Sequence, residues 1–291
     1  MATPLKLLVS IANYGNSQLS YLQQVVREFQ SYSPAFSVDI IVHSNIELPI
    51  EGITVKIIKN LPDWWELPFI ARKVIYDKRN DYDLFIFNEN DHLITQSNVE
   101  AFLDLSKSVP SEFIIGFFQY ECGNGTRYFP AYHGLFRWQK TSAILFGSAV
   151  FARFTNHHQA SFLVTRQQLL KAVKNIDFFK ENKFSRYKRA DRVGADMYYL
   201  AGFTKLICLS RFSDILIHHL PDKYLTYGAS DKVIQADIKM LLAKPIRENS
   251  FSRGMYLLNA RIERWMDRIL FSPCLTAKFR RDLDHLFKIK R

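Results

Sequence analysis

The sequence contains little cysteine, and its three cysteines are far apart. Cys122, Cys208 and Cys274 form no CxxC pair, so we expect neither a disulfide scaffold nor a zinc site with cysteine ligands. Reduced thiols in a cytoplasmic protein are the expectation. No apolar run approaches the roughly 18 residues that a membrane span requires. The apolar segment at residues 5–12 is too short and too weakly basic for a signal peptide, and a β-strand explains it better.

Two common nucleotide-binding patterns are also absent. The sequence has neither the glycine fingerprint of dinucleotide-binding folds nor the P-loop lysine motif, so NAD and ATP chemistry have no direct support. Hydrophobic residues make up 48% of the 291 residues and aromatic residues 14%, which is ample for a packed core. The length fits one large domain, or one domain with an appendage.

Positive charge exceeds negative charge along the chain. The 39 Lys and Arg residues against 28 Asp and Glu residues give a net charge of +11. Such a balance favours polyanionic partners, which are nucleic acid, an acidic membrane surface or phosphorylated substrates. No recognised nucleic-acid motif accompanies it, so we expect no nucleic-acid partner.

Strand and helix patterns alternate along the first 95 residues. They follow the order β-α-β-β-α-β, at residues 5–12, 20–31, 38–42, 53–58, 68–78 and 84–87. This order predicts an α/β fold with a mixed, mainly parallel sheet flanked by helices. Ligands of such sheets bind beyond the C-terminal ends of the strands. The loops at Asn13, Ser44 and Glu89 are therefore expected to face one crevice.

The remaining elements are less regular. Strands are expected at residues 113–120, 160–164, 205–209 and 215–217, and helices at residues 99–105, 166–174 and 196–202. The basic polar stretch from Lys180 to Arg192 is most simply a surface loop.

The segment DYDLFIFNENDHLIT, residues 81–95, delivers two carboxylates to the end of a buried strand. Glu89 and Asp91 lie two residues apart, directly after the apolar run of residues 84–87. Mg²⁺ and Mn²⁺ prefer oxygen ligands, often one or two carboxylates together with substrate phosphates. The pattern fits a metal site at the mouth of the sheet. It also fits a solvated acidic turn, which is common after strands.

The surrounding segment resembles nucleotide-sugar glycosyltransferases of the GT-A fold. In these enzymes a helix bearing an Ala-Arg pair precedes a strand that ends in a DxD motif. Ala71-Arg72 and Glu89-Asn90-Asp91 occupy those places here. The first acid is Glu rather than Asp, which implies that Asp91 holds the ion while Glu89 acts through water.

The resemblance extends over residues 5–225 and implies further roles. The segment Ser10 to Tyr14, with Ser10, Ala12, Asn13 and Tyr14, would pack against the nucleobase, and Arg72 would assist on the diphosphate. Asp196 would be the catalytic base, with Asp191 as its competitor. His218 or His219, after the strand at residues 215–217, would complete the metal site.

These roles together imply a metal-dependent glycosyltransferase. It would use Mn²⁺ or Mg²⁺ and a nucleotide-sugar donor, with UDP- and GDP-sugars as the first candidates, and it would more readily be inverting than retaining. The acceptor would be a glycan or a lipid-linked glycan of cell-surface polysaccharide synthesis. The alternative is a non-catalytic protein that binds a nucleotide or glycan on the same scaffold.

Two further polar or aromatic clusters have open roles. Trp64-Trp65 either stacks on a sugar or base or simply packs. The run Asn156-His157-His158-Gln159 either lines an acceptor pocket or belongs to a loop without a catalytic role.

The C-terminal region differs from the rest. Residues 244–291 contain twelve Lys or Arg and five Asp or Glu, so they carry +7 of the total charge. We expect a domain at residues 1–243 and a basic helical extension at residues 244–291. Its apolar stripe consists of Leu258, Ile262, Trp265, Met266, Ile269 and Leu270. The stripe either packs on the domain or adheres to an anionic membrane, which would place the protein at the inner face of that membrane.

Overall fold

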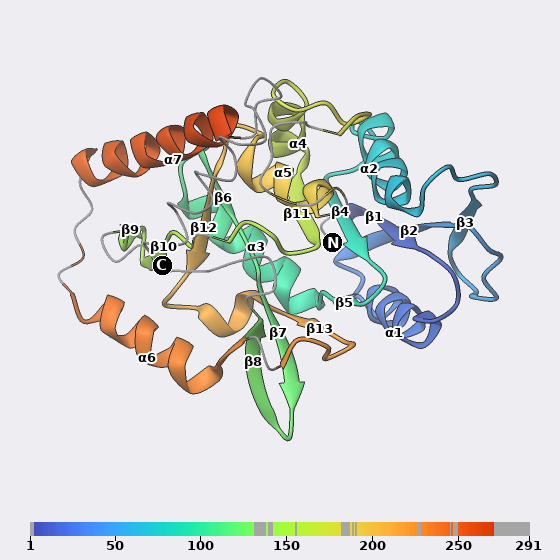
Figure 1. The fold of residues 1–291 in the computed structure, drawn as a ribbon, viewed down its shortest axis with the longest axis horizontal. Coiled ribbons are helices and arrows are strands. Elements are labelled where there is room, and N and C mark those ends of the chain that lie inside the picture. Colours follow the sequence, from blue (N-terminus) through green and yellow to red (C-terminus); the bar gives the residue numbers. More distant parts are fainter. Residues whose placement is uncertain are drawn as a thin grey trace.

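The computed structural model describes residues 3–130, 138, 142–154, 156–181, 187, 189, 191–225, 228–244, 246 and 250–270. Within these residues the chain forms three β-sheets with helices packed on them (Figure 1). The expected α/β class with mixed sheets flanked by helices is confirmed. Residues 271–291, with Cys274 and the end of the expected basic extension, lie outside the described part.

The first sheet is the one predicted from the N-terminal pattern. Its strand order is β11-β4-β1-β2-β3, with β1 (Leu5–Asn13), β2 (Phe36–Ser44), β3 (Thr54–Ile57) and β4 (Leu84–Glu89) all parallel. Only β11 (Ser161–Thr165), at its edge, runs antiparallel to its neighbour β4. The C-terminal ends of β1, β2 and β4 therefore meet at one edge, as the strand pattern predicts.

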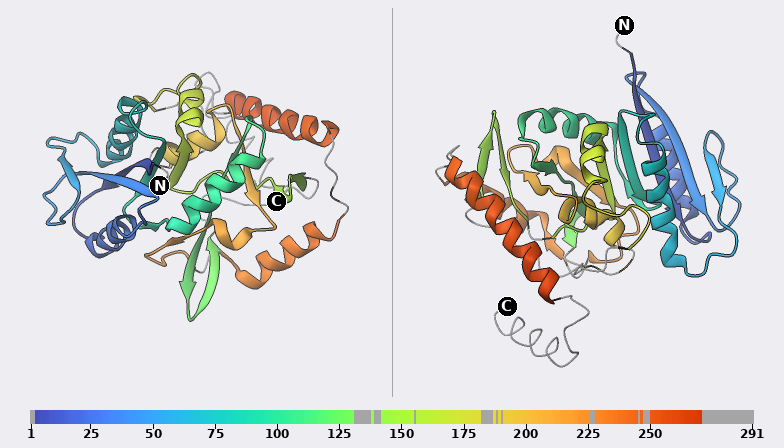
Figure 2. Two further views of the ribbon diagram at one scale, coloured as in Figure 1. Left: turned by 180° about the vertical axis from the view of Figure 1, so that it is seen from behind. Right: turned by 90° about the horizontal axis from the view of Figure 1, so that it is seen from above.

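Two helices cover opposite faces of this sheet (Figures 1 and 2). Alternate residues of β1 separate accordingly: Leu7 and Val9 pack with the apolar side of α1 (Leu19–Gln30), and Leu8 packs with that of α2 (Leu67–Asp77). Because successive side chains of a strand point to opposite faces, an apolar run such as LLVSIA is buried on both sides.

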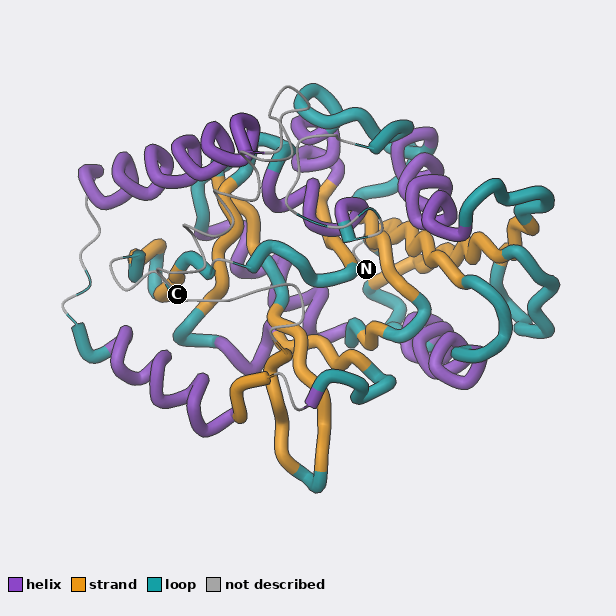
Figure 3. The backbone as a smooth tube through the Cα atoms, viewed as in Figure 1, coloured by secondary structure: helices purple, strands orange, loops and turns teal. Residues whose placement is uncertain are grey.

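The second and third sheets build the other half of the molecule. The second has the order β6-β12-β10-β9, formed by β6 (Phe113–Ile115), β12 (Thr204–Cys208), β10 (Ala149–Ala152) and β9 (Ile144–Phe146). The third has the order β14-β8-β7-β13-β5, formed by β14 (Gly228–Ser230), β8 (Thr126–Pro130), β7 (Phe118–Gly123), β13 (Leu216–His219) and β5 (His92–Leu93). Figure 3 shows how the β7–β8 hairpin extends from the body.

One expected strand is divided in two. Residues 113–120 do not form a single strand: β6 ends at Ile115 and pairs with β12, whereas β7 begins at Phe118 and pairs with β13. The break falls at Gly116, whose N–H still donates to the carbonyl of Leu206 at 2.8 Å. A single glycine thus marks the point where the chain leaves one sheet for the next.

The remaining helices are α3 (Gln96–Ser108), α4 (Arg166–Ala172), α5 (Arg192–Tyr199), α6 (Asp231–Leu242) and α7 (Ser250–Leu270), with 3₁₀ turns η1 (Trp64–Glu66) and η2 (Phe212–Ile215). α3 is longer than expected because Thr95 forms a capping box with Asn98 and starts the helix early. α5 begins four residues before the expected 196 and ends at Tyr199. No helix in the described ranges is both long and apolar enough to cross a membrane.

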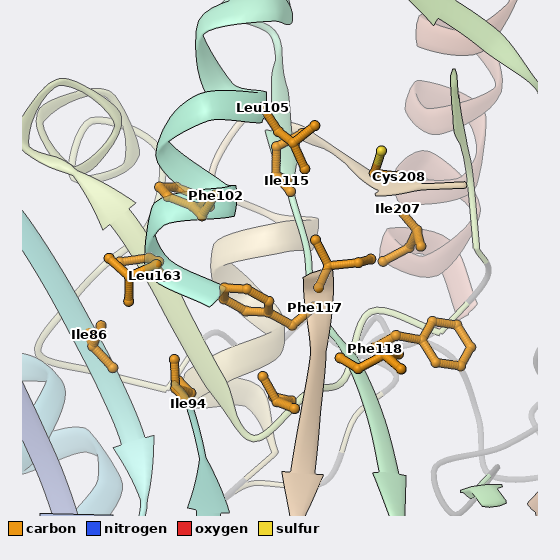
Figure 4. Close-up of a cluster of buried hydrophobic side chains, with 14 of the residues drawn as sticks. Ile86, Ile94, Phe102, Leu105, Ile115, Phe117, Phe118, Leu163, Ile207 and Cys208 are labelled. Carbon is orange, nitrogen blue, oxygen red and sulfur yellow. The ribbon is translucent and has the colours of Figure 1, made fainter. Parts of the chain in front are cut away.

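The apolar core lies on both sides of the first sheet and continues between the other two. Figure 4 shows Phe102 of α3 and Phe117 facing Ile94 and Leu163 in its centre. These side chains are almost completely buried. The core therefore holds the edge of the first sheet firmly against the segment that contains Gly116 and β7.

α7 lies along one side of the body (Figure 2), and three residues of its expected apolar stripe are exposed. Glu263 forms an ion pair with Arg153 of β10's neighbouring loop, and Arg264 donates to the carbonyl of Phe203 at 3.2 Å. Leu258, Ile262 and Trp265 are 48%, 49% and 60% exposed. These three side chains therefore do not pack on the domain, whereas Leu257, Glu263 and Arg264 of the same helix contact it.

Candidate functional site

A cavity of about 480 Å³ opens at the C-terminal edge of the first sheet. Its floor comes from the ends of β1 and β4, and its far wall comes from β7, β13 and the segment before β11. The residues that line it include Ala12, Tyr14, Gln18, Trp64, Trp65, Glu89, Asn90, Asp91, His92, Gln119, Asn156, His158, Asp191, His219, Lys223 and Tyr224. The expected crevice is thus present, and a cavity of this size suits a small-molecule ligand.

Hydrogen bonds from the side-chain amides of Asn88 and Asn90 fix the polar segment at the end of β4. Asn88 donates to the carbonyl of His92 at 2.7 Å and closes the turn. Asn90 donates to the side-chain oxygen of Asn13 at 2.7 Å, and Asn13 donates to the carbonyl of Gly15 at 3.0 Å. These bonds tie the ends of β4 and β1 together. The segment is therefore a built turn that fixes Asp91, and not a loosely solvated one.

Three side chains in the cavity converge as a possible metal site. One ligand atom from each of Asp91, His92 and His219 lies within 4.8 Å of the other two. Asp91 Oδ1 is 2.8 Å from His92 Nδ1, and Asp91 Oδ2 is 3.5 Å from His219 Nε2. Gln18 also donates to Asp91 Oδ2, at 3.0 Å. A carboxylate and two imidazoles on one wall leave open coordination positions toward the cavity.

His219 is oriented from behind by a buried carboxylate. Its Nδ1 lies 2.5 Å from Glu121 Oε1, and the backbone N–H of Tyr224 donates to Glu121 Oε2 at 2.6 Å. With Nδ1 donating to Glu121, Nε2 is the nitrogen that faces Asp91. This carboxylate–histidine arrangement is the usual support of a metal-ligating histidine.

Burial and neighbouring charges both shift the pKa values of the ionisable groups in this cluster. Burial alone would raise the pKa of Asp91, but the charge of His92 and the hydrogen bond to His219 outweigh it and hold that pKa well below its ordinary value. Burial lowers the pKa of His219, but Asp91 and Glu121 outweigh it and raise the pKa to about 9. The pKa of Glu89 is raised well above its ordinary value by burial and then by the charges of Asp91 and Asp191.

The donor set fits a transition metal ion. Asp91 Oδ1 is buried and accepts no well-aligned hydrogen bond from the described residues, although His92 Nδ1 is in contact with it. A carboxylate oxygen in that state has a lone pair available for a cation. Two imidazoles with one carboxylate favour an ion such as Mn²⁺ over Mg²⁺ or Ca²⁺, which prefer oxygen-only sets.

The expected metal ligands are only partly brought together. Asp91 and His219 belong to the cluster, and Glu89 lines the same cavity outside the group of three. His218 points away: its Nε2 is 3.2 Å from Asp222 Oδ1, and its ring stacks on Tyr120 at 4.8 Å. Consecutive residues of a strand face opposite sides, so β13 delivers only one of the two histidines.

The two expected carboxylate bases are also separated. Asp191 lines the cavity, whereas Asp196 is fully buried and lies 3.4 Å from Arg72, which is fully buried too. Arg72 also donates to the carbonyls of Asp177 and Lys180 at 2.8 and 3.1 Å. The expectations that Asp196 is the base and that Arg72 contacts a diphosphate are therefore corrected. Both side chains are fully buried and contact each other, so neither reaches a ligand in the cavity.

Of the residues expected to bind the nucleotide, Ala12 and Tyr14 line the cavity, whereas Ser10 and Ser44 are fully buried and are not among its lining residues. The Ser10 hydroxyl donates to the carbonyl of Ala71 at 2.8 Å. The Ser44 hydroxyl accepts from the N–H of Ile46 at 3.2 Å. Both serines therefore position neighbouring segments and do not face a ligand.

Aromatic side chains form one rim of the cavity. Trp64 and Trp65 stack at 3.6 Å, and Tyr14 lies 6.1 Å from Trp64. A second hollow of about 420 Å³ adjoins this rim, lined by Tyr14, Asn45 and residues 58–64. Tyr14 and Trp64 are about half exposed, so their faces are available to a flat ring.

The stretch from Lys180 to Arg192 is less exposed than expected. Within its described residues, Tyr187 is buried and its hydroxyl accepts from the N–H of His157 at 2.8 Å. Arg189 pairs with Asp63 at 2.8 Å and Glu66 at 2.6 Å. These contacts bring the stretch against η1 and place Asp191 at the cavity.

Sequence reasoning did not assign three contributors. His92 directly follows the acidic motif, and its position in the turn was the available signal. Glu121 lies in β7 shortly before Gly123 and Gly125, and Gln18 precedes α1. Neither shows a pattern in the sequence, because the pairing of β13 with β7 brings Glu121 to His219, and Gln18 reaches Asp91 from the residue before α1.

No protein-family model matches this chain, and no curated protein matches it either.

Proposed function

We propose that this protein is a metal-dependent glycosyltransferase of the GT-A class that uses a nucleotide-sugar donor. The observation that carries the proposal is the cluster of Asp91, His92 and His219 at the C-terminal edge of a parallel sheet, beside an aromatic rim. In this class a metal at that edge neutralises the charge of the leaving diphosphate. Mn²⁺ is the proposed ion because of the two imidazoles.

The residues of the chain divide the work of binding and proton transfer. Asp91, His92 and His219 would hold the ion, and Glu121 fixes the orientation of His219. Lys223, an exposed cation on the cavity wall, is placed to face a diphosphate. Tyr14 and Trp64 offer their faces to the nucleobase.

Asp191 is the proposed catalytic base, and the proposed reaction is inverting. Its carboxylate lines the same cavity as the metal cluster. In that position it can accept the proton of an acceptor hydroxyl as the hydroxyl attacks the sugar carbon. Asn156 and His158 line the wall on the acceptor side.

We further propose that the acceptor is a glycan or a lipid-linked glycan, and that α7 holds the protein on an anionic membrane. Leu258, Ile262 and Trp265 stand outward along one side of the helix, and Arg261 beside them is exposed. Exposed apolar side chains next to basic ones match the interface of an anionic bilayer. The inner face of a membrane is where a lipid-linked acceptor would be found.

A thermal-shift panel tests the function. UDP-, GDP-, CMP- and dTDP-sugars are each added with Mn²⁺ or with EDTA. We expect one nucleotide class to raise the Tm only with Mn²⁺, since ligand at about 100 times its Kd adds roughly 2.7 kcal/mol of stability. Release of the free nucleotide diphosphate with that donor then measures turnover.

Two adjacent histidines provide the matched control. His219→Gln should abolish the Mn²⁺-dependent shift, whereas His218→Gln should preserve it, because His218 faces Asp222 and Tyr120. If no nucleotide sugar shifts the Tm at saturating concentration, the proposed function is wrong. A shift without turnover, unaffected by Asp191→Asn, would instead indicate a non-catalytic binding protein on the same scaffold.

A further inference from the structure

A lysine occupies the interior of the second sheet. Lys205 is the second residue of β12, a strand whose five residues are all buried, and it is only 3% exposed. Lysine is almost never buried to this degree without a partner, because desolvating an ammonium group is costly. An apolar side chain would be more stable at this position if packing were its only role.

The backbone leaves room for this side chain. A Cβ atom on Gly116 would overlap Cε of Lys205, and its Cγ would lie 2.8 Å away. The lysine therefore passes directly over Gly116, at the break between β6 and β7. The glycine makes space for the Cγ to Cε part of the side chain.

Among the described residues, the Lys205 ammonium group has an aromatic ring beside it but no hydrogen-bond acceptor. Its Nζ lies 4.9 Å from the centre of the Tyr198 ring. Within the described part of the chain it donates no hydrogen bond and forms no ion pair, and burial, the sole cause of its pKa shift, lowers that pKa to about 7. A cation–π contact offsets only part of the desolvation cost. The group is thus suited to an anionic partner that the described residues do not provide.

Lys205 lines a small hollow next to the main cavity. The hollow measures about 20 Å³, and it shares Gln119, Pro130, Asn156 and His158 with the main cavity. Phe117, Phe118, Phe129 and Phe154 form its apolar sides. Since about 10–15 Å³ holds one water molecule, this annex accepts the end of one small polar group and no sugar ring.

We propose that Lys205 recognises a carboxylate carried by a sugar bound in the main cavity, so that the substrate is an acidic sugar such as a uronic acid. This inference rests on the proposed function in taking the ligand to be a sugar. The annex is too small for a phosphate with three free oxygens, and a single ammonium group matches a single negative charge. The carboxylate belongs to either the donor sugar or the acceptor sugar.

A bound carboxylate would form a buried, charge-assisted hydrogen bond with Lys205. A neutral sugar would leave the ammonium unpaired, and sites built around a buried polar group reject ligands that cannot pair with it. We therefore expect discrimination of at least about tenfold between acidic and neutral sugars of the same shape.

Calorimetric titration with Mn²⁺ present tests this expectation in two arms. The donor arm compares UDP-glucuronate with UDP-glucose, and the acceptor arm compares methyl glucuronide with methyl glucoside. The wild-type protein should prefer the acidic member in one arm, which identifies the source of the carboxylate. Lys205→Met should lose that preference and change the affinity for the neutral member by less than about twofold. The exposed Lys239→Met control should keep it.

Equal binding of acidic and neutral members to the wild-type protein in both arms would overturn the inference, as would a preference that survives in Lys205→Met. Sugar transfer without acidic preference would refute this inference alone, whereas acidic preference without any transfer would refute the proposed function alone.

Discussion

The carboxylates of Asp191 and Asp196 lie in different environments, although the sequence alone does not distinguish them. Asp191 borders the cavity, and Asp196, five positions later, is enclosed with Arg72. The first can exchange a proton with a ligand, while the second balances a buried guanidinium. Their substitution should therefore affect different properties of the protein.

Asp191→Asn and Asp196→Asn form a matched pair. Asp191→Asn should lower kcat by about 10²- to 10⁴-fold, the range for losing a general base, with little change in Tm. Asp196→Asn should lower the free energy of unfolding by about 3–5 kcal/mol, because it leaves the Arg72 charge buried without its partner. Turnover assays and chemical denaturation measure the two effects. If Asp196→Asn instead lowered kcat without loss of stability and Asp191→Asn did not lower kcat, Asp196 would be the base.

His43 should make stability depend on pH. Its ring is fully buried, and burial, followed by the charge of Lys56, lowers its pKa from 6.5 to about 4. Between these two values the unfolded chain binds a proton that the folded protein does not bind. The contribution of His43 to the free energy of unfolding is therefore fully present above about pH 6.5. It decreases by roughly 3 kcal/mol as the pH drops to about 4.

The comparison of wild type with His43→Gln isolates this contribution from the carboxylates. Denaturation curves measured from about pH 4.5 to about pH 7 give the slope of stability against pH for each protein. The variant should have the shallower slope. Equal slopes would mean that His43 accepts its proton in the folded protein.

Two helical glycines have different surroundings, and only one of them lies against another element. A Cβ on Gly194 of α5 would lie 3.0 Å from the backbone nitrogen of Ser161 and 3.3 Å from its oxygen, so α5 rests directly on β11. A Cβ on Gly254 of α7 would meet no atom within 4 Å. Helix propensity favours alanine over glycine equally at both positions.

Gly194→Ala and Gly254→Ala should consequently change stability in opposite directions. Gly194→Ala should cost about 1–3 kcal/mol because the backbone of β11 cannot yield easily. Gly254→Ala should gain about 0.5–1 kcal/mol from the reduced flexibility of the unfolded chain. Urea denaturation measures both. A stabilised Gly194→Ala would show that α5 shifts away from β11 without cost.

For the helices and strands, the sequence predicts much of the fold, but it predicts less of the cluster around Asp91. The N-terminal elements follow from periodicity alone, since strands of a parallel sheet are apolar on both faces and α1 and α2 are amphipathic. The break at Gly116 was not predicted, because β6 and β7 read as one apolar run. The choice between His218 and His219 depends on which face of β13 meets Asp91, and that is a tertiary property.

The whole molecule joins its site from distant parts of the chain. Asp91 follows β4 of the first sheet, while His92, Glu121 and His219 belong to β5, β7 and β13 of the third sheet. Such long-range pairing leaves no local sequence signal, which is why Glu121 was missed. A metal ion bound there would link the two sheets, so that its binding free energy also stabilises the fold.

Membrane attachment is tested on the intact protein with vesicles. We expect sedimentation with phosphatidylcholine–phosphatidylserine vesicles and much less with phosphatidylcholine alone. Replacing Leu258, Ile262 and Trp265 with serine should weaken binding at least about tenfold, since burial of each side chain contributes up to about 1.5–3 kcal/mol. Serine at the exposed Val233 and Met240 of α6 is the control. Equal loss in both variants would refute a specific role for α7.

The stacked pair Trp64 and Trp65 has an optical consequence. The chain has four tryptophans, and this pair stands at the rim of the cavity, whereas Trp265 stands on the outer side of α7. Indole emission is quenched when a nucleobase stacks on the ring, and it shifts to shorter wavelength when the ring leaves water. Fluorescence intensity therefore reports occupancy of the cavity, and a blue shift that Trp265→Phe removes reports contact with lipid, without any label.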